Sequence, residues 1–175
     1  MIDPVDLNRR IRQLVVFCTG MDPANVRPAN QLGAATGDQW ATVLVIGQRT
    51  PGPSANLWSN VDATHVKETE HTQYQITASI QFFRQDAMLL ATKLRDRLGL
   101  SSATQLMQDL NLGFVSAKPV RNLAQVVNSN WEERAQMDID FHVGVTEEDT
   151  INSFAKFPVT VTNGNSSTSS EVIQP

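Results

Sequence analysis

Residues 72–84, TQYQITASIQFFR, decide the fold class, because apolar and polar side chains alternate strictly along them. A period of two is typical of a β-strand that buries one face. Residues 131–145 repeat the pattern, and we expect both segments to be core strands. The side chains predicted to face the core are Tyr74, Ile76, Ala78, Ile80, Phe82, Ala135, Met137, Ile139, Phe141, Val143 and Val145. The side chains predicted to face outward from the second strand are Arg134, Gln136, Asp138, Asp140 and His142.

The segment between Asp3 and Gly20 is predicted to be a helix. Asp3 is a favourable N-cap, Pro4 suits the first helical position, and Gly20 supplies a stop. Leu7 and Ile11 begin an apolar face at helical spacing, which continues to Cys18. We therefore expect this helix to lie on another layer of the molecule.

After the first core strand, the apolar period changes from that of a strand to that of a helix. Asp86 is expected to cap a helix that ends at Gly99. Ser102 with Gln105 resembles a capping box and predicts a second short helix. Further strands are expected at 39–48, 61–69, 114–118 and 120–127.

The order of helix, strands, two helices and strands predicts an α+β fold. We expect a mixed or antiparallel β-sheet, with the N-terminal helix and a two-helix insertion packed on one face. The composition becomes polar near residue 146, which divides the chain into a domain at 1–145 and a C-terminal extension at 146–175. The extension is expected to be either an arm that contacts other subunits or a disordered tail.

The composition is that of a globular protein with wide uncharged surfaces. Hydrophobic residues make up 41% of the 175 residues and charged residues only 18%, whereas Asn, Gln, Ser and Thr number 12, 13, 12 and 15. The net charge of −4 excludes a basic protein that binds nucleic acid or anionic membranes with its whole surface. Cys18 alone makes no internal disulfide. No apolar run approaches the about 20 residues of a membrane-spanning helix, so we expect a soluble protein without a signal peptide.

Motifs for catalysis and cofactor binding are scarce. Gly33 and Gly37 are not followed by the Lys and Ser or Thr of a phosphate-binding loop. Asp138, Asp140 and His142 share one predicted strand face and are the best candidate metal ligands. A metal-dependent hydrolase that uses them is the less favoured alternative to a solvated acidic face. We expect no enzyme, no metal and no cofactor.

One candidate contact surface lies in residues 49–60. This segment is expected to be irregular because Pro51 and Pro53 flank a glycine. Leu57 and Trp58 lie within it, and exposed Trp is a typical anchor of protein interfaces. The alternative is that the segment folds back over the sheet.

The extension contains one strand-like segment, FPVTVT at 157–162. Phe157, Val159 and Val161 alternate along it, and such a strand can add to the sheet edge of a neighbouring subunit. A disordered tail, or docking on its own chain, fits equally well. Asn163-Gly164 favours a hairpin only between two strands, and no second strand is expected after it.

Two blocks carry a resemblance to a known family. They are QYQITASIQFFRQDAMLLATKLRDRL at 73–98 and LNLGFVSAKPVRNLAQVVNSNWEERAQMDIDFHV at 110–143, and they resemble the phage neck terminator family of head–tail junction proteins. The most specific part is Trp131-Glu-Glu-Arg-Ala-Gln, followed by Asp138, Ile139 and Phe141. FCTGM and VRPANQ, within 17–31, resemble the family's opening loop. The resemblance covers about residues 3–145 and leaves out the extension.

This resemblance implies a tail-terminator-like fold and a structural virion protein, made in the cytoplasm of the host bacterium. It implies a homo-oligomeric ring, most simply a hexamer, that caps the tail at the neck. The ring would join the tail tube or sheath proteins to the head–tail connector and let double-stranded DNA pass without specific binding. The alternative is a monomeric adaptor that uses Trp58 and the extension to bind a partner.

Two sets of residues are predicted to serve such a ring. The interface candidates are Leu57, Trp58, Trp131, Glu132, Arg134, Phe157, Val159 and Val161. The lumen candidates are Asp138 and Asp140. Duplex DNA slides past an acidic or neutral wall more easily than past one that binds its phosphates.

Overall fold

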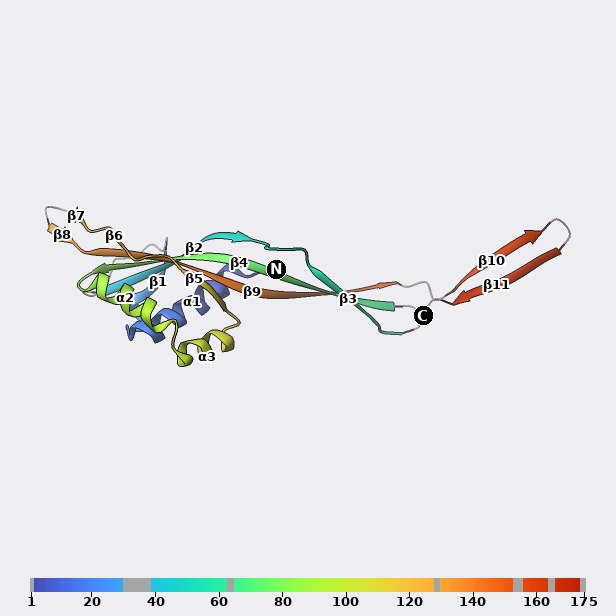
Figure 1. The fold of residues 1–175 in the computed structure, drawn as a ribbon, viewed down its shortest axis with the longest axis horizontal. Coiled ribbons are helices and arrows are strands. Elements are labelled where there is room, and N and C mark those ends of the chain that lie inside the picture. Colours follow the sequence, from blue (N-terminus) through green and yellow to red (C-terminus); the bar gives the residue numbers. More distant parts are fainter. Residues whose placement is uncertain are drawn as a thin grey trace. The chain divides into compact units, whose positions relative to one another are not determined.

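The computed structural model describes residues 2–29, 39–62, 65–127, 130–152, 156–163 and 166–173 (Figure 1). The side chains at 127 and 130, and those of the last two ranges, are outside this description. The chain forms two compact units. The first unit contains residues 1–53 and 73–145, and the second contains 54–72 and 146–175.

The main sheet is built on two long neighbouring strands, β4 (His65–Arg84) and β9 (Arg134–Asn152). Its order is β1 (Val26–Pro28), β2 (Gln39–Arg49), β4, β9 and β5 (Gly113–Ala117), with β3 (Ala55–Asn60) also on β4 and β6 (Arg121–Asn122) also on β9. The β1–β2 pair is parallel, whereas the pairs that β2 and β3 make with β4, and β5 and β6 make with β9, are antiparallel. The sheet is therefore mixed.

The predicted core alternation is confirmed along both long strands. Every second residue from Ile76 to Phe82, and from Ala135 to Phe141, is fully buried. Tyr74 and Val145, at the ends of the two runs, are only partly buried. Asp140 differs from the prediction, because it was expected to face solvent and is only 6% exposed.

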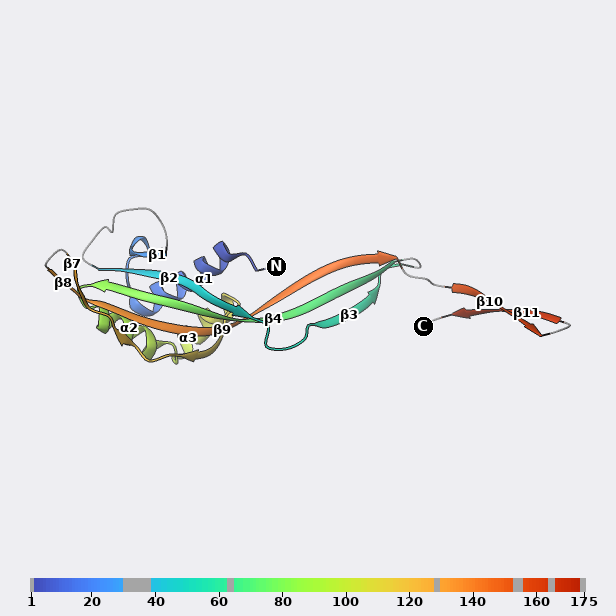
Figure 2. The same ribbon diagram turned by 90° about the horizontal axis from the view of Figure 1, so that it is seen from above.

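Three helices cover one face of the sheet in the first unit (Figures 1 and 2). They are α1 (Pro4–Thr19), α2 (Ala87–Arg97) and α3 (Ser101–Asp109), with a short 3₁₀ helix, η1 (Pro23–Asn25), after α1. α1 begins and ends as predicted: Asp3 accepts a hydrogen bond from Val5 N at 2.9 Å, and Gly20 takes the left-handed conformation with φ 77°. No helix in the described ranges is long and apolar enough to cross a membrane.

The cap position predicted for α2 is confirmed without its side-chain hydrogen bond, and the cap predicted for α3 is wrong. Asp86 occupies the N-cap position of α2 with a φ of 61°, but its side chain makes no cap hydrogen bond and accepts instead from Gln39 Nε2 at 3.2 Å. The N-cap of α3 is Leu100, so Ser102 lies inside the helix. Gln105 donates to Asp109 within α3 rather than back to the helix start.

Three expectations about strands are corrected. The segments 61–69 and 72–84 were expected to be separate strands, but residues 65–69 and 72–84 belong to one strand, β4. Residues 49–60 were expected to be irregular, yet β3 forms beyond Pro53, because a proline breaks only its own neighbourhood and β4 supplies backbone partners. β9 continues past residue 145 to Asn152, since pairing with β4 does not require apolar side chains.

The remaining strands form two small sheets. β7 (Gln125–Val127) pairs with β8 (Asn130–Glu132), and β10 (Lys156–Asn163) pairs with β11 (Ser166–Ile173), both antiparallel. The expectation that no strand follows Asn163 is wrong, because Ser166 pairs with it and begins β11. The Ser- and Thr-rich strand carries no apolar alternation, so the sequence pattern did not reveal it. The division at 145 into a domain and an extension stays a prediction.

Candidate functional site

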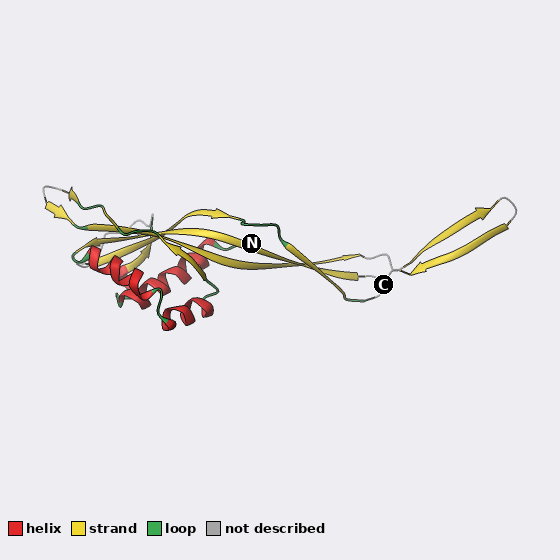
Figure 3. Ribbon diagram, viewed as in Figure 1, coloured by secondary structure: helices red, strands yellow, loops and turns green. Residues whose placement is uncertain are grey.

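The face of the main sheet opposite the helices carries several groups of polar side chains. Figure 3 shows the helices of the first unit on one side of its strands and no helix on the other. Because side chains alternate along a strand, the residues between the buried positions of β4 and β9 share this second face. The members that make polar contacts there are Gln75, Thr77, Ser79, Gln81, Arg134, Gln136, Asp138 and Asp140. We call this set the polar sheet face.

Asp140 is the most enclosed charge of the polar sheet face. It accepts hydrogen bonds from Thr77 Oγ1 at 2.6 Å and Ser116 Oγ at 2.9 Å, and Lys118 Nζ lies 3.3 Å from its Oδ2. The hydrogen bond from Thr77 holds the pKa of this carboxyl below its usual range, with smaller help from Ser116 and Lys118 and against the effect of burial. Asp140 is therefore a structural carboxylate held between β4 and β5.

Asp138 is engaged in the same way. Arg121 Nη2 donates to its Oδ2 at 2.8 Å, and Gln136 Nε2 donates to its Oδ1 at 3.1 Å. Gln136 also donates to Ser79 Oγ at 2.7 Å, which ties β9 to β4. Each of the two lumen candidates thus has a cation beside it, and the polar sheet face does not present two free carboxylates.

The three candidate metal ligands, Asp138, Asp140 and His142, do not form a metal-binding cluster. Within the described ranges, no group of three or more His, Cys, Asp or Glu side chains is placed to hold a metal ion. Asp138 and Asp140 direct their oxygens toward Arg121 and Lys118. Cations at these positions compete with a metal for the same lone pairs, so the geometry gives no support to a hydrolase built on His142 and its neighbours.

Arg134, an interface candidate, is engaged within its own sheet. Its Nη2 donates to Gln81 Oε1, and its guanidinium carbon lies 5.0 Å from the ring centre of Phe83. Phe83 stacks on Trp40 with ring centres 3.9 Å apart and planes 4° from parallel. This Trp40–Phe83–Arg134 stack joins β2, β4 and β9, and a cation over an aromatic face adds about 0.5–1 kcal/mol at an exposed site.

Trp131, by contrast, points away from the core of its chain. It is 70% exposed and pairs across β7–β8 with Val126, which is 64% exposed. Glu132 on the same strand is partly exposed. Two residues of the motif that carried the family resemblance therefore have different surroundings. Arg134 stabilises the sheet, whereas Trp131 forms an exposed apolar pair with Val126.

Leu57 and Trp58 lie on β3 of the second unit and not in an irregular loop. They are 59% and 56% exposed. Neighbouring residues of a strand point to opposite faces, so the two side chains do not act as one patch.

Side-chain contacts join β4 and β9 in the second unit. Lys67 Nζ lies 2.7 Å from Glu148 Oε1, and His71 Nδ1 lies 3.0 Å from Thr146 Oγ1, so the two strands remain side by side.

The side chains of Phe157, Val159 and Val161 lie outside the described residues, and so do Gly33 and Gly37. The backbone of β10 is described and has a partner in β11. FPVTVT is therefore not a lone strand, and its role in a subunit contact stays a prediction.

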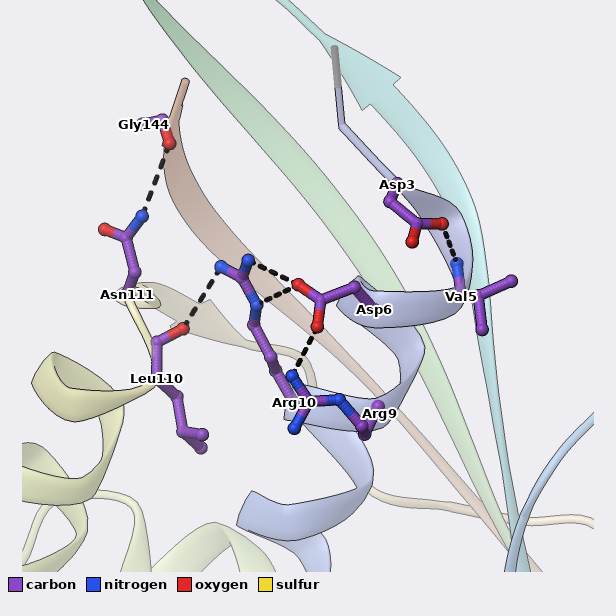
Figure 4. A network of polar contacts seen from close by, with 8 residues as sticks. All are labelled: Asp3, Val5, Asp6, Arg9, Arg10, Leu110, Asn111 and Gly144. Carbon is purple, nitrogen blue, oxygen red and sulfur yellow. Dashed lines mark hydrogen bonds and ion pairs between the residues drawn. The ribbon is translucent and has the colours of Figure 1, made fainter. Parts of the chain in front are cut away.

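A second polar network surrounds the start of α1 (Figure 4). Asp6 pairs with Arg9 and Arg10, and these guanidiniums, Arg9 first, hold the pKa of the Asp6 carboxyl below its usual range. Arg10 Nη1 also donates to Leu110 O at 3.4 Å, which occupies one of the free carbonyls at the end of α3. Asn111 Nδ2 donates to Gly144 O at 3.3 Å. The network joins α1, the end of α3 and β9.

An open apolar pocket of about 590 Å³ lies along α1 from Arg9 to Phe17 and was not predicted from the sequence. Its lining comes from α1, η1, β1 and α3: Arg9, Arg12, Gln13, Val16, Phe17, Pro23, Val26 and Leu106. Phe17, which is 45% exposed, is the large apolar side chain that this pocket leaves open to solvent. A sequence signal did exist, because Val16 and Phe17 extend the apolar character of the helix beyond its core face.

Comparison with known proteins gives a match to a family. The model of the family described as phage neck terminator protein matches residues 5–165. This confirms the resemblance, and the match extends beyond residue 145, where the resemblance was expected to end. No curated protein matches the chain significantly.

Two solved structures show low similarity to this chain. The sheath/tube terminator, in its extended state, of the extracellular contractile injection system PVC has a TM-score of 0.48 at 7% identity, over 95% of this chain. This chain spans 65% of that one. A chain from the virion of a native gene transfer agent particle has a TM-score of 0.26 at 13% identity, over 77% of this chain and 95% of that one.

The lowered pKa of Asp140 predicts a dependence of stability on pH. A carboxyl whose folded pKa is depressed stabilises the fold above its unfolded pKa of about 3.9, and this contribution is lost as pH falls through the folded pKa. Asp140→Asn should reduce the free energy of unfolding at pH 7 by about 1–3 kcal/mol, as expected for hydrogen bonds to a charged group. The difference from the native protein should shrink progressively as pH falls below the unfolded pKa of about 3.9.

Urea unfolding at pH 7 and at pH 2.5 measures this effect. Asp96→Asn is the matched control, because Asp96 is exposed beside Arg95 and should change stability by less than about 0.5 kcal/mol. A loss in Asp140→Asn that is the same at both pH values would contradict the role given to the charge.

Proposed function

Because the chain belongs to the phage neck terminator family, we propose that it is a structural protein of the phage neck that forms a ring closing the end of the tail. The observation that carries the proposal is the family match over residues 5–165, which covers both described units in large part. A hexamer is the stoichiometry we expect. The tail tube or sheath proteins on one side and the head–tail connector on the other are its expected partners, with DNA passing through the ring.

The exposed apolar side chains of the single chain support an assembled state. Trp58 and Trp131 are more than half exposed, on β3 and β8. Burying apolar area contributes about 25 cal/mol per Å², and Trp is enriched among the residues that dominate binding energy. A ring requires two different surfaces on each subunit, because the contact is head-to-tail. β3 of the second unit and the β7–β8 pair of the first unit are the two surfaces we assign to it.

The polar sheet face is the surface that we assign to the channel. Asp138 and Asp140 contribute negative charge there, and Arg121, Lys118 and Arg134 offset it, which leaves these five groups with a net charge of +1. A nearly neutral wall of this kind neither holds the phosphates of DNA nor repels them strongly. This role is that of a passive lining and needs no catalytic residue.

The first prediction from the proposed ring concerns mass. Six chains of 19.3 kDa make a particle of about 116 kDa, which light scattering after size exclusion should detect as concentration rises. A particle of this mass would exclude the monomeric adaptor. A strict monomer up to millimolar concentration would contradict self-assembly of the isolated chain.

The second prediction concerns Trp58. Trp58→Ala should weaken association by about 30-fold or more, corresponding to an interface anchor worth about 2 kcal/mol. The fold should survive, because the side chain is already 56% exposed in the single chain. Val5→Ala is the matched control, since Val5 is 78% exposed at the start of α1 and lies outside the two assigned surfaces. Assembly of Trp58→Ala at native concentration would remove Trp58 from the interface.

The third prediction concerns DNA. The native protein should bind a 30-base-pair duplex more weakly than about 10⁻⁴ M at 150 mM salt, which is the weak end of non-specific binding. Asp138→Asn leaves Arg121 without its ion pair and should raise the affinity measurably, with a steeper dependence on salt. Fluorescence anisotropy at two salt concentrations measures both. Tight, salt-sensitive binding by the native protein would contradict a passive lining.

A further inference from the structure

β3 has an open edge with none of the features that usually protect one. Among the described strands it pairs only with β4, and all six of its residues, ANLWSN, are exposed. Natural edge strands carry charged side chains, prolines or bulges that prevent pairing with another chain. β3 contains no charge, no proline and no glycine, and its register with β4 has no shift. This edge is suited to accept a further strand.

The backbone groups that would accept the strand are identified by the register. Val61 N donates to His65 O at 3.1 Å, one step beyond the Asn60–Val66 pair. Hydrogen-bonded and non-hydrogen-bonded pairs alternate along an antiparallel ladder. Leu57 and Ser59 therefore bond to β4, whereas the residues whose N–H and C=O groups point to the open edge are Asn56, Trp58 and Asn60.

β11 offers a matching edge. Among the described strands it pairs only with β10, along eight residues in which Glu171 is the one charged residue and proline is absent. β10 is less suited on its own outer edge, because it contains Lys156 and Pro158. A two-stranded hairpin is only marginally stable in water, so a third strand would stabilise β10–β11.

We propose that β11 of one copy pairs with the open edge of β3 in a second copy. This strand exchange rests on the proposed ring and adds the β10–β11 hairpin to the two surfaces assigned to it, since each subunit would give its hairpin to the next. It extends the β9–β4–β3 sheet of the receiving copy by two strands, β11 and then β10. The main-chain hydrogen bonds supply affinity, and the outward groups of β3 set the register.

Chain length explains why the partner is a second copy and not the same chain. β9 ends at Asn152 and β10 begins at Lys156, four Cα steps that span at most about 14 Å. If β11 paired with β3 of its own chain, β10 would lie four strand spacings from β9, about 19 Å at about 4.8 Å each. The connection is too short for that arrangement, so β11 can pair with a β3 edge in this way only in another copy.

Cross-linking between differently tagged copies tests the exchange. One copy carries Ser59→Cys and a mass tag, and the other carries Ser169→Cys. Cys18 does not interfere, because it is fully buried and burial raises the pKa of its thiol to about 11. A short bis-maleimide should give the tagged–untagged dimer at least ten-fold above the level obtained with Ser102→Cys, on α3, in place of Ser59→Cys. A tagged–untagged dimer no more abundant than in the Ser102→Cys control would overturn the proposal.

A proline on the open edge provides an independent measurement. Asn56→Pro removes an N–H that points outward, while Asn56→Ala keeps it, and both lose the hydrogen bond from Asn56 Nδ2 to Glu68 Oε1. Asn56→Pro should abolish the cross-link and lower the oligomer mass, and Asn56→Ala should retain both, with circular dichroism confirming that each variant folds.

Different experimental results would contradict the strand exchange and the ring. If the native protein stays monomeric at every concentration, the ring fails and the exchange fails with it. If the native oligomer forms but the Ser59–Ser169 cross-link is absent and Asn56→Pro assembles normally, the strand exchange alone is wrong.

Discussion

The pairing of β4 with β9 is the constraint on which the rest of the structure depends. Each strand places an unbroken row of apolar side chains on one face, and burying that face is what holds the helices against the sheet. The same pairing brings polar side chains together on the other face. Thr77 and Asp140 are 63 residues apart in the chain, yet Thr77 Oγ1 lies 2.6 Å from Asp140 Oδ1 because their strands are neighbours.

The polar sheet face shows how this pairing changes the chemistry of its residues. Two carboxylates two residues apart on a strand suggest a free acidic surface or a metal site. Once β5 and β6 pair with β9, they bring Lys118 and Arg121 next to these carboxylates. The charge is then compensated and the hydrogen-bonding capacity is largely used within the sheet. The face is better suited to structural support and to passive contact than to catalysis.

Much of the fold could be predicted because its signals are local. The cap at Asp3, the stop at Gly20 and the alternation along β4 and β9 each depend on residues close together in the chain. β3 and β11 were missed for one physical reason. Neither strand carries an apolar alternation in its sequence, so only its pairing partner reveals it. The exposure of Trp131 and the engagement of Arg134 were equally hidden, since adjacent motif residues gave no indication of their different surroundings.

The sequence by itself determined the mixed α and β composition, the first helix, the two core strands and the resemblance to phage neck terminators. These follow from periodicity, capping and motif, which a linear chain displays directly. The tertiary structure alone decided which carboxylates are compensated, which aromatic side chains stay exposed and which strand edges remain open. Those properties depend on what lies across the sheet, and the residues that meet there are dozens of positions apart in the chain.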